Sequence, residues 1–160
     1  MTILITAYTS YDEVRSTIGM STDTLPDTVL SLELYANSLE LALDDIDIAD
    51  TALNPIKTVF STLDPVADST AYNLTRLYAT YSVALEVAVS LSMRAPKTLS
   101  DSKVTLTRFS PESTWKDVIA AIKKNLGKLK EDLEGIGDTT AATATPYLTA
   151  VKPTYDPVTG

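Results

Sequence analysis

The polar and apolar residues near the start of the chain predict a short helix. Ser10 precedes the first turn, Glu13 follows three residues later, and Gly19 comes directly after the apolar residue Ile18. A serine and a glutamate at this spacing form a capping box, and glycine commonly ends a helix. We therefore expect a helix between Ser10 and Gly19.

A second pattern predicts a long amphipathic helix in residues 24–53, with Pro26 near its first turn. Apolar residues recur at steps of four and three at Leu25, Val29, Leu32, Ala36, Leu39, Leu43 and Ile46. A second row lies off this stripe and consists of Leu30, Leu34, Leu41 and Ile48. We expect this helix to be covered on more than one side, and a single short chain need not supply both covers.

The middle of the chain predicts a short helical turn and then a helix that is apolar nearly all round. The turn, residues 56–63, lies between Pro55 and Pro65. Residues 69–93 contain only Arg76 and Glu86 as charged residues. Such a helix belongs in the centre of a bundle or in a subunit interface. Its length and its Thr, Ser, Arg and Glu residues argue against a membrane span, and Pro96 should end it.

Residues 103–109 alternate like a strand. Val104 and Leu106 would lie on one face, with Thr105, Thr107 and Phe109 on the other. An isolated strand leaves backbone donors and acceptors unpaired. We therefore expect this arm to find a partner, either elsewhere in the chain or on another molecule.

The last periodic segment predicts a helix that starts after Ser110 or Ser113 and ends at Gly135 or Gly137. Its expected buried stripe is Trp115, Val118, Ile119, Ile122, Leu126, Leu129 and Leu133. Residues 138–160 have no helical period and are rich in Thr, Ala and Pro, so we expect an extended tail. The sequence thus predicts an all-α domain, residues 1–137, with about four helices in a bundle and a short β-like arm at about 98–110. The extended C-terminal tail, residues 138–160, follows this domain.

Composition excludes several kinds of chemistry. The net charge is −8 and the isoelectric point is near 4.4, which disfavours sequence-independent binding to nucleic acid. The chain has no cysteine and no histidine, so disulfides, thiolate or histidine metal sites and Ser-His-Asp triads are impossible. The apolar start has no basic region and is too short to span a membrane, so we expect no targeting signal and no membrane partner.

Three remaining patterns could each indicate either a chemical site or an ordinary structural feature. Ser113 and Lys116 have the S-x-x-K spacing of penicillin-binding enzymes, but an N-cap followed by a surface lysine is favoured because the other motifs are missing. The acidic run from Asp44 to Asp50 fails the calcium-loop pattern, which favours a solvated helix end or a negatively charged lumen. The lysines of the last helix alternate with acidic residues, as on a solvated face. We expect no enzyme, no metal and no cofactor.

Three stretches together carry a resemblance to a known family. They are "YTSYDEVRSTIGMSTDTLPDTVLSLELY", "APKTLSDSKVTLTRFS" and "WKDVIAAIKKNL", which occur in this order within roughly residues 8 to 135. In these stretches the chain resembles the head-tail adaptor (head completion, or connector) proteins of tailed bacteriophages.

The resemblance implies a structural virion protein, made in the cytoplasm of the bacterial host and located at the head-tail interface. It implies a helical bundle that forms a homo-oligomeric ring, commonly of about twelve copies, below the portal protein and joined to a downstream tail or nozzle protein. DNA would pass through the channel without specific binding. The residues expected to contact partners are Lys103, Val104, Leu106, Arg108 and Phe109 in the arm and Tyr147, Leu148, Val151, Tyr155 and Val158 in the tail.

Two other functions remain open at this point. A tail-completion or tail-tube-associated protein of the same virion is the nearer alternative, and binding to tail proteins but not to portal would indicate it. A generic helical protein-interaction module would explain the helices but not the arm together with the tail.

Overall fold

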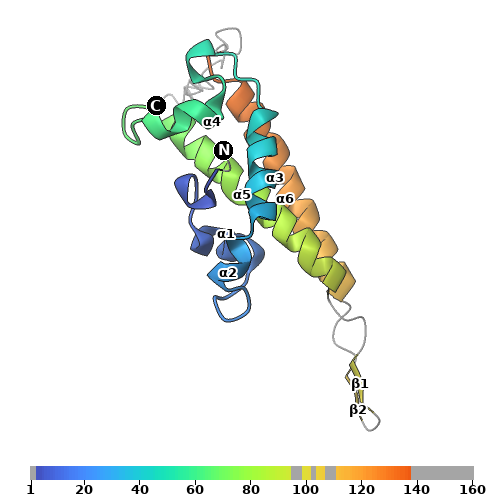
Figure 1. Ribbon diagram of the computed structural model, residues 1–160. Helices are drawn as coiled ribbons and strands as arrows, with labels where there is room; N and C mark the ends of the chain where they lie inside the picture. Colours follow the sequence, from blue (N-terminus) through green and yellow to red (C-terminus); the bar gives the residue numbers. More distant parts are fainter. Residues whose placement is uncertain (1–2, 95–98, 102–103, 107–110, 138–160) are drawn as a thin grey trace, which may run out of the picture.

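The computed structural model describes residues 3–94, 99–101, 104–106 and 111–137 (Figure 1). The helices are α1 (Tyr11–Ile18), α2 (Asp27–Leu30), α3 (Glu33–Asp44), α4 (Ile56–Val59), α5 (Ser69–Arg94) and α6 (Pro111–Glu134). Short 3-10 turns occupy Ile5–Ala7, Thr51–Leu53 and Phe60–Thr62. The described chain is mostly helical, which confirms the all-α prediction.

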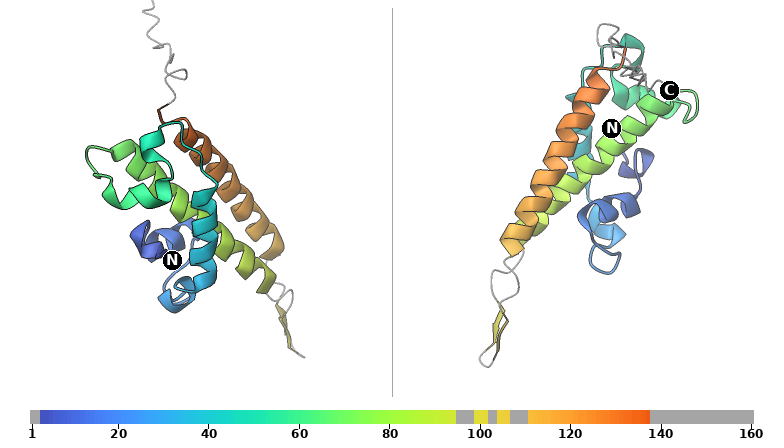
Figure 2. Two further views of the ribbon diagram at one scale, coloured as in Figure 1. Left: turned by 45° about the horizontal axis from the view of Figure 1, so that its top comes forward. Right: turned by 180° about the vertical axis from the view of Figure 1, so that it is seen from behind.

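The two longest helices, α5 and α6, pack along each other, and α1 and α3 pack on α5 (Figures 1 and 2). α5 can take this central place because its residues are apolar on nearly every side. The core contains fully buried side chains from three helices, with Leu39 and Leu43 on α3, Val83 and Val87 on α5, and Leu133 on α6. Burying such side chains is the main stabilising contribution to a fold of this kind.

The predicted helix between Ser10 and Gly19 is confirmed as α1. The Ser10 hydroxyl accepts a hydrogen bond from the Glu13 backbone N–H at 3.3 Å, and the Glu13 carboxylate accepts one from the Ser10 backbone N–H at 3.2 Å. Gly19 ends the helix with φ 71°, a left-handed conformation that glycine adopts without a steric cost.

The single long helix predicted over residues 24–53 is wrong, because the chain divides it into α2 and α3 and α3 ends at Asp44. Ser31 and Leu32 separate the two helices, and Leu32 has the extended angles φ −62° and ψ 136°. The bend lets the chain before α3 return to α1. There the buried Arg15 donates hydrogen bonds to the Leu25 carbonyl at 3.1 Å and to the Asp27 carboxylate at 2.6 Å. These contacts join residues that are ten and twelve positions apart in the sequence, and they favour the bend. The periodicity of apolar residues carries no information about such contacts.

Aromatic side chains hold the region between α3 and α5 in place. The predicted turn after Pro55 is confirmed as α4 with the 3-10 turn that follows it. Phe60 in that turn stacks between Tyr8 and Tyr72, with ring centroids at 4.8 and 5.0 Å. The Tyr8 hydroxyl also donates a hydrogen bond to the Lys57 carbonyl at 2.8 Å. Stacked rings at these distances are favourable beyond their buried area.

The predicted C-terminal ends of the two long helices, α5 and α6, agree with the structure. α5 ends at Arg94, close to the expected stop at Pro96, and α6 runs from Pro111 to Glu134 with Gly135 next. The end of α6 is tied to the segment after α3, since Ala49 N–H donates to the Glu134 carbonyl at 3.3 Å and Asp50 N–H to the Ile136 carbonyl at 3.1 Å.

The predicted strand in the arm has its partner within the chain. β1 (Leu99–Asp101) and β2 (Val104–Leu106) pair antiparallel, with Leu99 opposite Leu106 and Asp101 opposite Val104. Both strands lie within the range of about 98–110 that was predicted for the arm. A hairpin pairs the backbone groups of β2 with those of the strand next to it in the sequence, and it needs only a short connecting turn.

Candidate interaction surfaces

The outward side of α3 carries two exposed leucines among polar residues. Leu34 and Leu41 are 61% and 71% exposed, whereas Leu39 and Leu43 on the same helix are fully buried. Leu34 and Leu41 are seven residues apart and so lie on one face, two helical turns from each other. Of the second apolar row predicted for this region, Leu30 and Ile48 are buried within the subunit. Leu34 and Leu41, which we call the α3 leucine pair, have no cover in the described part of the chain.

A second incomplete surface lies along α5. One hollow of about 280 Å³ is lined by Leu77, Tyr81, Asn125, Lys128, Leu129 and Asp132, so it lies between α5 and α6. A neighbouring hollow of about 270 Å³ is lined by Glu13, Ser16, Thr17, Arg76, Leu77, Thr80 and Tyr81, between α1 and α5. Leu77 and Tyr81 belong to both. We call the two hollows together the α5 groove.

The α3 leucine pair and the α5 groove lie on opposite sides of the subunit. Ser90 of α5 faces α3, because its hydroxyl and that of Tyr35 are 3.0 Å apart. Tyr81 is nine residues from Ser90, which is two and a half turns of an α-helix, so it lies on the opposite side of α5 from Ser90. Figure 1 shows α3 in front of α5, and the view from behind in Figure 2 brings α5 and α6 forward.

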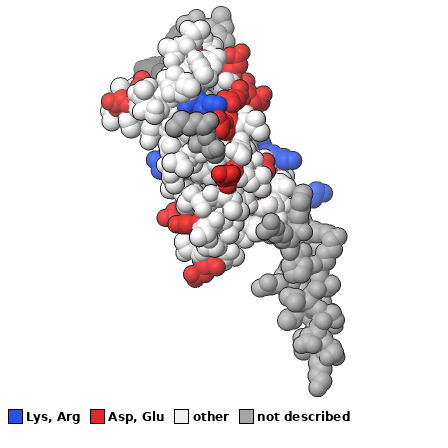
Figure 3. All heavy atoms as spheres, viewed as in Figure 1, with Lys and Arg blue, Asp and Glu red and all other residues white. Residues whose placement is uncertain are grey.

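Charge is unevenly distributed between these two sides. No basic residue lies between Arg15 and Lys57, and this segment contains Asp23, Asp27, Glu33, Glu40, Asp44, Asp45, Asp47 and Asp50. Residues 116–134 of α6 carry both signs of charge, with the basic residues Lys116, Lys123, Lys124, Lys128 and Lys130 and the acidic residues Asp117, Glu131, Asp132 and Glu134. In Figure 3, acidic atoms are spread over the face that carries α3, and basic atoms appear along the edge where α6 runs.

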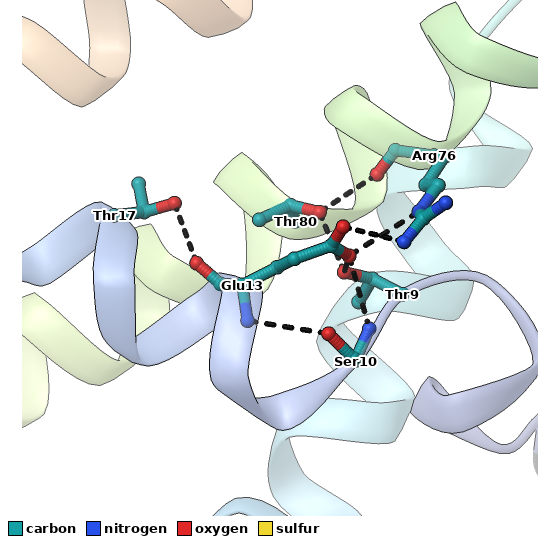
Figure 4. A network of polar contacts seen from close by, with 6 residues as sticks. All are labelled: Thr9, Ser10, Glu13, Thr17, Arg76 and Thr80. Carbon is teal, nitrogen blue, oxygen red and sulfur yellow. Dashed lines mark hydrogen bonds and ion pairs between the residues drawn. The ribbon is translucent and has the colours of Figure 1, made fainter. Parts of the chain in front are cut away.

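The wall of the α5 groove is fixed by a polar network between α1 and α5 (Figure 4). The Glu13 carboxylate accepts hydrogen bonds from Arg76 Nε at 3.2 Å and from the Thr9 hydroxyl at 3.0 Å. The Thr9 and Thr80 hydroxyl oxygens are 2.6 Å apart, and Thr80 also reaches the Arg76 carbonyl at 2.9 Å. The two threonine hydroxyls have one proton each, so they can donate to two of their three contacts at any one time.

This network lowers the pKa of Glu13. Burial is the largest single influence and raises the pKa, but hydrogen bonds from the Ser10 N–H, Arg76 and Thr9 together outweigh it. The pKa of Glu13 therefore lies below its ordinary value of 4.5, and the carboxylate is ionised near neutral pH. Arg76 and Glu13 therefore form an ion pair between α5 and α1.

The acidic run after α3 is occupied by contacts within the subunit. Lys57 Nζ lies 3.2 Å from Glu40 and 2.7 Å from Asp44, and Lys130 Nζ lies 2.5 Å from Asp45. Asn54 donates to Asp47 at 2.7 Å, while Asp50 caps the turn at Ala52. Within the described ranges no group of three or more carboxylates is arranged to hold a metal ion.

The contact residues predicted from the sequence fall in other places. Val104 and Leu106 lie in β2, for which the structure gives the backbone pairing. Lys103, Arg108, Phe109 and the five tail residues Tyr147, Leu148, Val151, Tyr155 and Val158 lie outside the described residues. The structure therefore leaves the predicted arm and tail contacts untested.

Sequence reasoning missed the α5 groove. Leu77 and Tyr81 were part of a helix interpreted as apolar all round, and Lys128 was interpreted as part of a solvated face. The sequence does place Leu77 and Tyr81 four residues apart, on one face of the helix and next to Arg76. Whether that face is exposed depends on where α1 and α6 pack against α5. Leu77 is 46% exposed in the folded subunit.

The chain matches no family model, no curated protein and no solved structure. Among the described helices, none combines the length and the apolar character that a membrane crossing requires.

Proposed function

We propose that this chain is a structural head-to-tail adaptor of a tailed phage, which forms a ring below the portal and joins the capsid to the tail. It would act in the virion, without a catalytic role, as a bundle of about four helices with an arm and an extended C-terminal tail. The family resemblance of residues 8 to 135 suggests this function.

The observation that supports the proposal best is the pair of incomplete surfaces on opposite sides of one subunit. Leu34 and Leu41 are exposed on α3, and Leu77 is exposed in the α5 groove. A ring of identical subunits needs two different surfaces on each copy, because each interface is heterologous. Exposed leucines at these two places are available for such contacts.

The acidic balance also agrees with a channel for DNA. With a net charge of −8, the subunit does not offer the excess of cations that binding to phosphates requires. A channel lined by such subunits lets DNA move without holding it.

The test is electron microscopy of the purified chain mixed with the portal protein of the same phage. We expect added ring-shaped density at the tail-facing end of the portal. Binding to tail proteins without binding to the portal would favour the tail-completion alternative. A chain that binds neither and stays monomeric would favour a generic interaction module.

A further inference from the structure

We propose that the contact between residues 49–50 and residues 134–137 is a latch, which opens and closes while the rest of the helical bundle stays folded. The latch lies where α6 ends and where the chain continues into residues 138–160. When it is closed, Gly137 is held against the segment that follows α3, and when it is open, Gly137 is released. The latch does not depend on the phage function proposed above.

A pair of backbone hydrogen bonds joins the two sides of the latch. Ala49 N–H donates to the Glu134 carbonyl at 3.3 Å, and Asp50 N–H donates to the Ile136 carbonyl at 3.1 Å. The last carbonyls of a helix find no partner within the helix itself. Here a segment far away in the sequence supplies partners at the end of α6. The two hydrogen bonds are therefore broken together when the segments separate.

The close approach of Gly137 to Asp50 shows that the closed latch needs a glycine. Gly137 has φ 84°, and a Cβ added to it would lie 2.6 Å from the Asp50 Cβ and 2.9 Å from the Asp50 backbone nitrogen. Glycine adopts this left-handed conformation readily and has no Cβ to collide with Asp50. A larger residue at position 137 would keep the latch from closing in this form.

The residues beside the latch are anchored more firmly than the latch itself. Ile46 and Ile48 are 3% and 2% exposed, and Leu133 of α6 is fully buried. In contrast, Ala49 and Gly137 are exposed, and the turn Thr51–Leu53 has no buried residue. Local opening occurs where few apolar contacts are buried and where the backbone hydrogen bonds are exposed to water. The latch has these properties, and the buried side chains beside it hold the bundle together when it opens.

An ion pair next to the latch can keep its two sides near each other in the open state. Lys130 Nζ on α6 lies 2.5 Å from the Asp45 carboxylate and 3.7 Å from that of Glu134. The contact with Asp45 includes neither Asp50 nor Gly137, so it can persist after the latch hydrogen bonds break. It limits the separation of the two segments and favours closing again.

Hydrogen exchange of single backbone amides, measured by NMR on the full chain, tests the latch. In the natural chain the amides of Ala49 and Asp50 should be protected to a similar degree, and less than those of Val83 and Val87 in the buried part of α5. Gly137→Ala should lower the protection of Ala49 and Asp50 by about tenfold or more, because alanine resists the left-handed conformation. The amides of Val83 and Val87 should keep their protection.

Gly19→Ala is the matched control for this variant. Gly19 also has a left-handed conformation, with φ 71°, but it ends α1 and has no atom within 4 Å of an added Cβ. Because Gly19 lies outside the latch, its substitution should leave the protection of Ala49 and Asp50 unchanged.

A second pair of variants isolates one hydrogen bond of the latch. Asp50 has φ −75°, a value that proline adopts, so Asp50→Pro removes the N–H that donates to Ile136. Asp50→Ala keeps this N–H, and both variants lose the carboxylate that accepts from Ala52 N–H. We expect the Ala49 amide to exchange about fivefold faster in Asp50→Pro than in Asp50→Ala, which is the factor for one hydrogen bond of ordinary strength.

Three outcomes would overturn the proposal. The first is unchanged protection of Ala49 and Asp50 in Gly137→Ala. The second is an equal loss of protection in Val83 and Val87, because residues 49–50 would then open only with the whole bundle. The third is equal exchange of the Ala49 amide in Asp50→Pro and Asp50→Ala, because the two hydrogen bonds would then break independently. None of these measurements uses portal protein, so they leave the phage function to its own test.

Discussion

Arg76 on α5 donates from Nε to the Glu13 carboxylate on α1 across 3.2 Å, and the pair joins positions 63 residues apart in the chain. Both side chains are partly exposed, so the pair belongs with the surface ion pairs that stabilise proteins modestly. It orders the wall of the α5 groove, where Thr9 and Thr80 complete the network (Figure 4).

A double-mutant cycle should measure this coupling. We expect Glu13→Gln and Arg76→Gln to show an interaction free energy of about 0.2–1 kcal/mol in urea unfolding. The Lys130–Glu134 pair, at 3.7 Å and one turn apart on α6, is the matched comparison and should show less coupling. Equal values for both pairs would mean that the threonines add nothing to the Glu13 contact.

The lowered pKa of Glu13 predicts an acid-sensitive contribution to stability. Because the folded pKa lies below the ordinary value of 4.5, the contribution is fully present above that pH and is lost as the pH falls through the folded pKa. Unfolding free energies measured between pH 6 and pH 3 should therefore decline less steeply in Glu13→Gln than in the natural chain. Asp64, whose pKa is also lowered by hydrogen bonds from the backbone N–H groups of Val66 and Ala67, still titrates in both proteins.

Two glycines in the C-terminal region should respond in opposite directions to alanine. Gly127 lies within α6 with open space at the position of an added Cβ, so Gly127→Ala should stabilise the protein by about 0.5–1 kcal/mol. Gly137 has φ 84°, and an added Cβ would lie 2.6 Å from the Asp50 Cβ, so Gly137→Ala should destabilise it. Thermal unfolding of the two variants measures both signs.

Gly137→Ala combines a strained backbone conformation with a steric contact, and Gly19→Ala isolates the first of these effects. Gly19 has φ 71° but no atom within 4 Å of an added Cβ, so only the backbone conformation resists the substitution, at about 1–2 kcal/mol. Gly137→Ala should cost more than this because of the contact with Asp50. A smaller cost at Gly137 would show that the connection between the end of α6 and Asp50 yields easily.

Trp115→Ala tests the outer part of the α6 stripe. Full burial of the indole would make its loss cost about 3–5 kcal/mol, but Trp115 is only partly buried in the subunit. We therefore expect a smaller loss in the monomer than for Leu133→Ala, whose side chain is fully buried and should cost about 2–5 kcal/mol. Chemical denaturation of both variants gives the order, and a larger loss at Trp115 would contradict it.

Deletion of residues 138–160 should separate stability from attachment. Those residues lack the apolar density to offset the entropy of their own ordering, so we expect the melting temperature of the monomer to change little. Attachment to portal protein should weaken strongly, because Tyr147, Leu148, Val151, Tyr155 and Val158 are the predicted anchors in the tail. Undiminished attachment would shift the portal contact to the arm around Arg108.

The sequence by itself determined those features that depend on neighbouring residues. The capping box of Ser10 and Glu13, the glycine stop at Gly19 and the extent of α5 follow from local hydrogen bonding and side-chain periodicity, and each is confirmed. Absence of cysteine and histidine is equally local information, and it excludes whole classes of chemistry. The sequence predicted that the strand β2 needs a pairing partner, but it did not identify β1 as that partner. Alternation of polar and apolar residues indicates a strand and does not indicate which segment lies beside it.

Only the tertiary structure decided the features that depend on which helices meet. The buried Arg15 fastens the start of α2 to α1, and this long-range contact accompanies a bend at Ser31 where periodicity predicts an unbroken helix. Leu30 and Leu34 belong to the same apolar row, yet the first is buried and the second is exposed. Exposure is a property of the packed neighbours rather than of the side chain, because the hydrophobic effect is non-directional and any apolar cover satisfies it.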